Sequence, residues 1–233
     1  VVTDMVDLQP WKKWAEKVSK VCCLLEVDSH CVLPRPVFGK SLDRPFKFRK
    51  ATDDQMRARV GRNWPIVRDE VRRMPESWSP PFEPVDVRLE LSKDGGAELL
   101  SKCEIDPTVV AVTGVTGGSS HAIEHWENWC DSGIRSYHMK RNNAALSDGV
   151  SGMSPWIHYG MISTTRMVRD ASLIGGKGAE KFLDEMLVFR EHAQHHVHAK
   201  DNPDDWANIP GWAITSWNDR RPEVSELSAI ELE

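Results

Sequence analysis

Hydroxyl and glycine residues gather in one short turn of the sequence, GVSGMSPWIHYG at residues 149–160. Ser151 and Ser154 supply hydroxyl donors and acceptors, Gly152 permits close approach of a ligand to the backbone, and Pro155 suits the first turn of a helix. The free amide groups of a helix start, with the positive end of its dipole, bind anions such as a pyrophosphate. Most turns of this kind are only helix caps. The turn therefore predicts a helix start and leaves an anion site open.

Histidines suggest a different chemistry further along the chain. His192 and His196 lie one helical turn apart, as do His121 and His125, and this spacing can clamp a zinc ion. Neither pair lies in the His-Glu-x-x-His pattern of zinc proteases, and the sequence names no third ligand. The prediction is that the chain holds no metal, with a metal-binding helical protein as an open alternative.

The composition is that of an ordinary globular protein. The chain has 233 residues, of which 40% are hydrophobic and 28% charged, and its formal net charge is −5. This charge gives no general attraction to nucleic acid or to an anionic membrane, and no apolar run approaches the ~20 residues of a membrane span. The five cysteines fit neither a disulfide framework nor a zinc spacing. We therefore expect an intracellular protein of a reducing compartment, with no membrane partner.

The elements that must position these residues follow from hydrophobic periodicity. A helical pattern starts at Trp11 and gives way to an apolar run over residues 21–27, which predicts a buried strand, and residues 1–4 predict a strand before the helix. Together they form half of an α/β unit. From residue 119, with a serine as cap, the sequence predicts helix after helix, interrupted by the glycine-rich turn at residues 174–178. The predicted fold class is mainly α.

Two segments between these regions have a distinctive composition. Basic side chains outnumber acidic ones between residues 34 and 69, and such a stretch can follow the phosphates of a nucleic acid. A solvated surface whose charges pair with neighbouring elements is the simpler interpretation. The prolines of SWSPPFEP, residues 77–84, exclude a helix and predict an extended linker.

Several motifs, taken in order, resemble those of the photolyase and cryptochrome family. YHMKRNNAALSDGVSGMSPWIHYGMIS resembles the family's flavin-binding signature. FLDEMLVFREHA resembles a helix of the class II cyclobutane pyrimidine dimer photolyases, and IPGWA and ELSAIELE follow in that class's order. VDSHCVLP, residues 27–34, resembles the segment that closes the family's antenna domain. The resemblance runs along nearly the whole chain.

The resemblance implies a fragment of a two-domain protein. Residues 1–79 would be the end of an α/β, Rossmann-like antenna domain, residues 80–117 an interdomain linker, and residues 118–233 the first half of an all-helical FAD-binding domain. The rest of the flavin pocket would lie beyond Glu233, so we expect this chain alone to bind FAD weakly or not at all.

The family's activity is light-driven repair of DNA. Reduced FAD absorbs blue light and donates an electron that splits a cyclobutane pyrimidine dimer in UV-damaged DNA, so the resemblance implies a carbon–carbon lyase that acts as a monomer. No catalytic side chain is assigned, because the cofactor carries the chemistry. Glu191 matches the glutamate that hydrogen-bonds the flipped-out lesion. The residues that match FAD-binding positions are Tyr137, Ser151, Gly152, Met153, Ser154, Pro155 and Arg190.

The sequence departs from the family at some matched positions. Phe189 stands where the family has the first arginine of an Arg-Arg pair, and Gln194 and His195 stand where Asp-Asn is common. These differences leave open a cryptochrome-like FAD photoreceptor without repair activity, or an inactive photolyase-like fragment.

The chain has ten tryptophans, a residue that serves core packing and, in this family, electron relay. The relay residues of the class lie mostly beyond this chain. Trp206, Trp212 and Trp217 are therefore interpreted as core residues.

Overall fold

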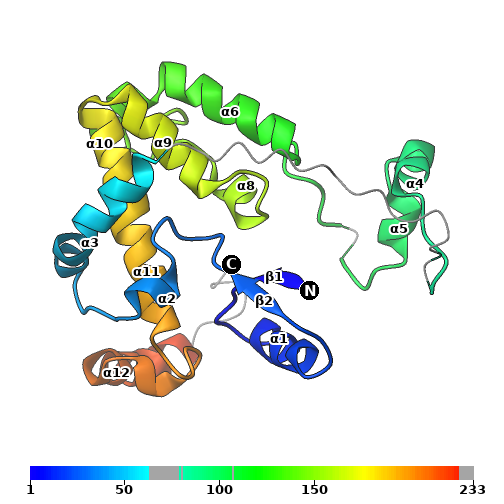
Figure 1. The fold of residues 1–233 in the computed structure, drawn as a ribbon, viewed down its shortest axis with the longest axis horizontal. Coiled ribbons are helices and arrows are strands. Elements are labelled where there is room, and N and C mark those ends of the chain that lie inside the picture. The colour runs from blue at the N-terminus through cyan, green and yellow to red at the C-terminus, as the bar shows by residue number, and fades with distance from the viewer. Residues whose placement is uncertain (63–78, 80, 107, 226–233) are drawn as a thin grey trace. The chain divides into compact units, whose positions relative to one another are not determined.

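The computed structural model describes residues 1–62, 79, 81–106 and 108–225 (Figure 1). They are mainly helical, which confirms the predicted fold class at that level. Among the described residues, no helix has the length and apolar character needed to cross a membrane. In chain order the elements are β1 (Val2–Asp4), α1 (Trp11–Ser19), β2 (Leu25–Val27), α2 (Arg35–Phe38), α3 (Pro45–Val60), α4 (Val87–Asp94), α5 (Ala97–Ser101), α6 (Ser119–Ser132), η1 (Ile134–Ser136), α7 (Tyr137–Lys140), α8 (Ser154–His158), α9 (Thr164–Ile174), α10 (Gly176–Asp184), η2 (Glu185–Arg190), α11 (Glu191–His198), η3 (Trp206–Asn208) and α12 (Gly211–Ser225).

The chain divides into two compact units, residues 1–62 with 117–233 and residues 63–116. The predicted boundary at residue 79 does not coincide with this division, because α2 packs on α11 and α3 packs on η2. The assignment of the two halves to an antenna and a flavin domain stays a prediction.

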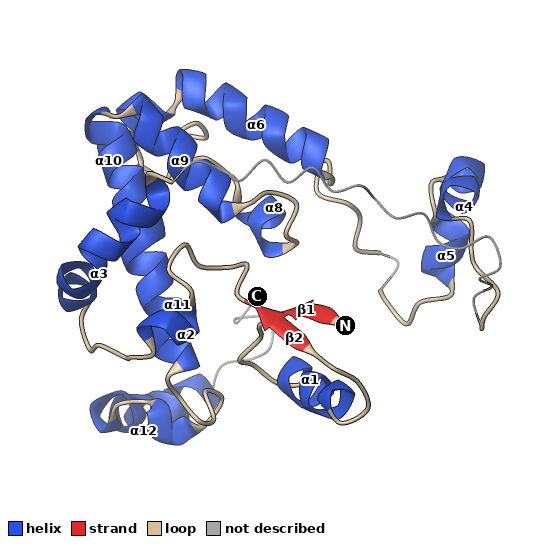
Figure 2. Ribbon diagram, in the orientation of Figure 1, coloured by secondary structure: helices blue, strands red, loops and turns tan. Residues whose placement is uncertain are grey.

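The amino-terminal segment forms the predicted β-α-β arrangement. β1 and β2 pair in parallel, and α1 connects them (Figure 2). The prediction that the second strand is buried is wrong, because Leu25 and Val27 are exposed, as are Trp11 and Trp14 of α1. Two strands of three residues offer too small a face to bury a helix against.

The segment predicted as a linker contains two short helices, α4 and α5. The Asp86 side chain caps α4 by accepting hydrogen bonds from the backbone amides of Arg88 and Leu89. The proline-rich motif at residues 77–84 lies partly outside the described residues, and residues 81–84 form neither helix nor strand.

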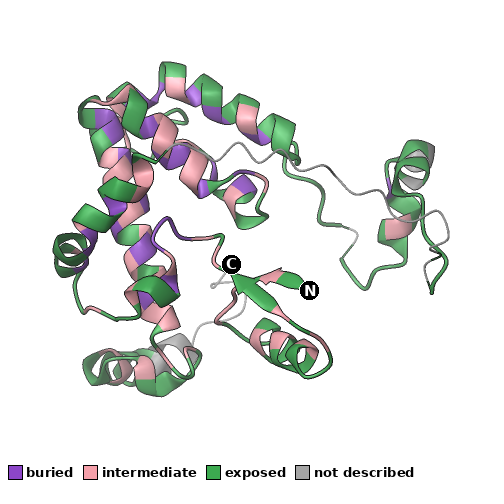
Figure 3. Cartoon of the chain, viewed as in Figure 1, coloured by how far each residue is buried: buried purple, intermediate pink, exposed green. Residues whose placement is uncertain are grey.

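The core of the larger unit lies among its helices. Trp126 of α6 is fully buried, packs on Phe182 of α10 with ring centroids 5.3 Å apart, and donates its Nε1 proton to Asp170 of α9 at 2.9 Å. Figure 3 shows buried residues recurring along α6, α9 and α10. The predicted helix at residue 119 is confirmed, but the predicted serine cap is wrong, because Gly118 is the capping residue and no side chain caps the helix.

A long helical segment follows the glycine-rich turn. Gly175 ends α9 and has a positive φ of 65°, which confirms the turn as a helix stop. From Gly176 to His198 the chain is helical, so the predicted helix is present but begins inside the predicted turn, and the six residues of η2 are π-helical. A π-helical turn changes which residues share a face, and such turns are frequent at functional sites. Hydrophobic periodicity does not predict it.

Trp206, Trp212 and Trp217 are exposed by 63%, 77% and 58%, so their interpretation as core residues is wrong. Apolar residues are spread around α12 rather than gathered along one side of it. In α6, by contrast, Trp126 and Trp129 lie three residues apart and face the core together.

Candidate functional site

A cavity of about 440 Å³ gathers residues that lie far apart in the sequence, and five of them are site residues predicted above. Of these five, Tyr137 comes from α7, Ser151 and Met153 from the turn before α8, Ser154 from the first position of α8, and Arg190 from the end of η2. We call it the Tyr137 cavity. Its size falls in the range of small-molecule sites, ~300–1,000 Å³. The remaining lining residues are His30, Ile157, His158, Met167, Phe182, Glu185, Met186 and Gln194.

The turn before α8 forms the predicted helix start, with Pro155 in the first turn. Gly152 has a φ of +65°, a backbone conformation that favours glycine, although a Cβ atom there would make only an ordinary contact of 3.5 Å with Nε2 of His125. α8 has only five residues, so its dipole is small. An anion at this turn would depend on side chains more than on the helix start.

Tyr137 occupies an aromatic wall of the cavity. Its ring meets Trp129 edge-on at 5.6 Å and Phe182 at 5.9 Å between centroids. Burial, and then the nearby charge of Glu185, raise the pKa of the Tyr137 hydroxyl. The hydroxyl is therefore held in its neutral, hydrogen-bonding form.

Arg190 and Glu185 stand on the η2 side of the cavity. Nη1 of Arg190 donates to the backbone oxygen of His30 at 2.7 Å. Glu185 pairs through Oε1 with Arg141 at 3.0 Å and with Lys181 at 2.9 Å. Sequence reasoning missed Glu185. The available signal was an acidic residue in the same photolyase-like motif as Arg190, one turn of η2 away.

The structure does not bring Glu191 to the Tyr137 cavity. Its side chain is 1% exposed and accepts hydrogen bonds from the backbone amides of Val32 at 2.6 Å and Leu33 at 3.2 Å. Burial raises the pKa of Glu191 to about 7, although both amide bonds act against this shift. A carboxylate buried and bonded in this way has no free surface for a DNA base, so its position does not support the predicted lesion contact.

The histidine pairs considered as zinc clamps are not part of a larger group of metal-binding side chains. Nε2 of His192 bonds the backbone oxygen of Leu42 at 2.7 Å, and Nδ1 of His196 bonds the hydroxyl of Ser41 at 2.9 Å. Nε2 of His125 bonds the backbone oxygen of Ser151 at 2.8 Å. Among the described residues, neither pair meets a third side chain that could complete a metal site, so the geometry favours neither pair.

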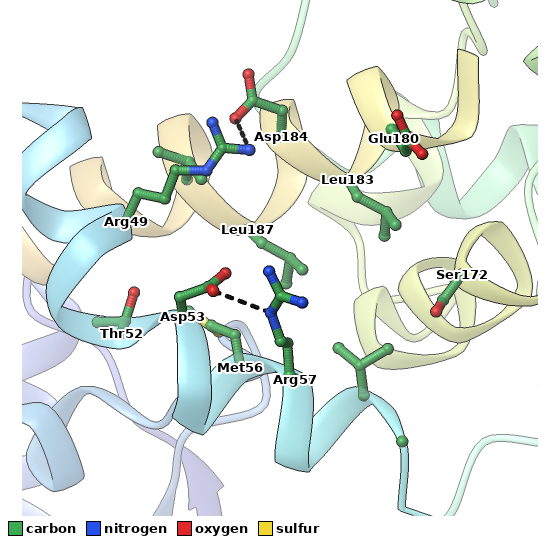
Figure 4. A pocket seen from close by; sticks show the side chains of 13 residues that line it. Arg49, Thr52, Asp53, Met56, Arg57, Ser172, Glu180, Leu183, Asp184 and Leu187 are labelled. Atoms are coloured by element: carbon green, nitrogen blue, oxygen red, sulfur yellow. Dashed lines mark hydrogen bonds and ion pairs between the residues drawn. The ribbon is translucent and has the colours of Figure 1, made fainter. Parts of the chain in front are cut away.

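A second cavity, of about 500 Å³, lies beside α3 (Figure 4). Its arginines are already paired, Arg49 with Asp184 at 3.1 Å and Arg57 with Asp53 at 2.9 Å. These two arginines of the basic stretch therefore have the ion partners expected of a solvated surface. Residues 63–69 of that stretch lie outside the described residues.

Comparison with known proteins links the chain to one enzyme family. No protein-family model matches it. Five curated proteins similar to it are all named deoxyribodipyrimidine photo-lyase. About half of the chain is thus similar in sequence to part of the photolyases.

Photolyases from an archaeon, a plant and a marsupial illustrate the match. The protein of Methanothermobacter thermautotrophicus is 30% identical over 119 residues, which are 50% of this chain and 26% of that protein. The Arabidopsis thaliana photolyase is 24% identical over 127 residues, covering 52% and 26%. That of Potorous tridactylus is 24% identical over 135 residues, covering 55% and 25%. The matched part thus spans about a quarter of each photolyase.

Proposed function

We propose that this protein is a DNA photolyase of the class II kind, which binds FAD in the Tyr137 cavity and uses it to split pyrimidine dimers in UV-damaged DNA, acting as a monomer. The observation that carries the proposal is the meeting of Tyr137, the Ser151–Ser154 turn and Arg190 in one cavity. These residues were expected at a flavin site from sequence motifs alone. The names of the relatives support the same family of reactions.

The lining of the cavity fits the two chemical halves of a flavin nucleotide. The hydroxyls of Ser151 and Ser154 and the guanidinium of Arg190 suit phosphate oxygens. Met153, Met167 and Phe182 offer apolar surface for flat rings.

The carboxylate that faces this cavity is Glu185. The resemblance gave the lesion contact to Glu191, but that side chain is bonded to the backbone of residues 32 and 33. Glu185 lines the cavity and is about a quarter exposed, so it can accept a hydrogen bond from a bound group. We therefore assign the role of polar acceptor toward a flipped-out base to Glu185.

Bound, reduced FAD would supply the absorption of light and the electron that splits the dimer. The residues of this chain would bind and orient it: Arg190 through charge, Ser151 and Ser154 through hydroxyls, and Tyr137 through a neutral hydroxyl. The hydrogen bond from Arg190 to the backbone oxygen of His30 orients the guanidinium group at the cavity before a ligand binds.

The test has two parts, flavin binding and repair. Titration of the protein with FAD, followed by flavin fluorescence, should show the weak binding expected of this chain, and Arg190→Ala should weaken it about tenfold or more, because a charge-assisted contact is lost. Arg135→Ala is the matched control, since Arg135 is exposed and lines neither cavity. Equal affinities of the two variants would exclude this cavity as the flavin site.

Repair is measured as light-dependent loss of dimers from an oligonucleotide that carries one, with reduced FAD present. If the protein is a photolyase, the oligonucleotide loses its dimer under blue light and keeps it in the dark. Binding of FAD without loss of dimers would instead favour a photoreceptor. The variant Glu185→Gln separates FAD binding from repair, because it should lower the rate of repair more than the affinity for FAD.

A further inference from the structure

Cys31, Glu191 and His195 meet in the dry interior of the larger unit. Their exposed fractions are 5%, 1% and 2%. One donor atom from each residue lies within 4.8 Å of the donor atoms of the other two. Glu191 and His195 are one turn apart on α11, and Cys31 comes from the connector between β2 and α2, residues 28–34. The cluster is separate from the Tyr137 cavity, which none of the three residues lines.

One nitrogen of the buried His195 ring has no partner. Nε2 lies 3.0 Å from the backbone oxygen of Leu33, which can only accept, so the ring proton is on Nε2. Nδ1 is then an unprotonated lone pair, and it is buried without any hydrogen bond. A buried acceptor without a partner is destabilising, and a metal-binding histidine characteristically donates its other nitrogen to a backbone carbonyl. His195 already has this arrangement.

Hydrogen bonds with neighbouring groups also hold Glu191 and the segment that carries Cys31 in place. Glu191 accepts the amides of Val32 and Leu33, which fixes its plane but leaves lone pairs on both oxygens. Asp28 accepts hydrogen bonds from the backbone amides of His30 at 3.1 Å and Cys31 at 3.2 Å, and it is itself paired with Arg35 at 2.9 Å. The connector that presents Cys31 is thus ordered before any ligand binds.

We propose that Cys31 Sγ, a carboxylate oxygen of Glu191 and Nδ1 of His195 form a site for one zinc ion. Sulfur, nitrogen and oxygen donors together are the set that Zn²⁺ binds. One ring nitrogen of His195 and one donor atom of each of the other two residues lie within 4.8 Å of one another, and three atoms spaced in this way share a centre at most about 2.8 Å from each. Small side-chain rotations then reach the Zn–ligand distances of ~2.0–2.3 Å.

The charges and protons of the site balance. As the S–Zn bond forms, Cys31 releases its thiol proton to the solvent, and the thiolate and the carboxylate neutralise the two charges of the ion. A neutral cluster is compatible with a dry interior, and a water molecule can fill the fourth position. Because the ligands come from α11 and from the connector, the ion would tie together two segments about 160 residues apart in the sequence.

Cobalt and zinc binding test the site. The protein is treated with a chelator and titrated with Co²⁺ or Zn²⁺ alone, with a competing chromophoric indicator. We expect one ion per chain, and a cobalt spectrum with a thiolate charge-transfer band and the visible bands of tetrahedral coordination. Cys31→Ala and His195→Gln should weaken binding at least about a hundredfold, since loss of an outer partner alone typically costs 10- to 100-fold.

Matched controls come from the same residue types. Cys130→Ser removes another cysteine of the helical unit, and the double variant His192→Gln/His196→Gln removes the neighbouring histidines of α11. All should keep affinity and spectrum. Binding that survives Cys31→Ala, or cobalt bound to the unmutated protein without a thiolate band, overturns the site. Failure of the folded, unmutated protein to bind one equivalent of metal also overturns the site. The stoichiometry and the cobalt spectrum are measured on the unmutated protein, so they do not depend on whether a variant folds.

Discussion

The η2–α11 segment has two sides that differ in almost every physical respect. Toward the Tyr137 cavity it presents Glu185 and Arg190, which are partly exposed and engaged with charged or backbone groups. Toward the connector at residues 28–34 it presents Glu191 and His195, which are buried. Arg190 and Glu191 are adjacent in sequence, but successive helical residues point about 100° apart. The comparison shows that a single sequence motif can supply both a partly exposed cavity wall and a fully buried cluster of side chains.

The largest difference between the two sides should appear in stability. Glu191→Ala leaves the amides of Val32 and Leu33 buried without an acceptor, so we expect the free energy of unfolding to fall by about 2 to 5 kcal/mol. Glu185→Ala removes two ion pairs of a partly exposed carboxylate and should cost about 1 kcal/mol or less. Urea denaturation in the presence of a chelator, followed by tryptophan fluorescence, measures both. Equal losses would remove the distinction between the sides.

The next effect concerns how α10 holds the cavity wall in place. A Cβ atom on Gly178 would lie 2.0 Å from the backbone oxygen of Ile134, so α10 approaches η1 as closely as a glycine allows. Gly178→Ala should therefore destabilise the protein by about 1 to 3 kcal/mol through overpacking. In the control Gly211→Ala the new methyl group meets nothing within 4 Å, and we expect a change within about 0.5 kcal/mol. Thermal unfolding measures both changes, and equal effects of the two substitutions would contradict this prediction.

The smallest effect tests the electrostatics of the cavity side. The chain has two tyrosines, so Tyr159→Phe leaves Tyr137 as the only phenol. Burial and the charge of Glu185 raise the pKa of Tyr137, so phenolate absorbance should appear above the ordinary midpoint of about 10. Adding Glu185→Gln should lower that midpoint, because a repelling negative charge is removed while the burial of the ring stays. An unchanged midpoint would mean that the two side chains do not interact.

Parts of the fold and site could be predicted because they depend on local pattern. The parallel β1–α1–β2 arrangement follows from an apolar run and a helical period, and the glycine stop at Gly175 follows from backbone conformation. Tyr137, Ser151 and Arg190 could be proposed for one site from motifs in order, before any geometry. The exposure of Trp212 could not be predicted from the sequence, because the burial of a side chain depends on what packs against its helix.

By itself the sequence determined the helical character of the protein, its likeness to photolyases and the residues of the turn before α8, because these depend on residue types at short spacing. Only the tertiary structure decided that Glu185 faces the cavity, that Glu191 is turned to the backbone of Val32 and Leu33, and that Cys31 lies beside His195. The physical reason is the π-helical turn of η2 and the packing of residues 28–34 on α11, which join segments about 160 residues apart through contacts with no trace in local pattern.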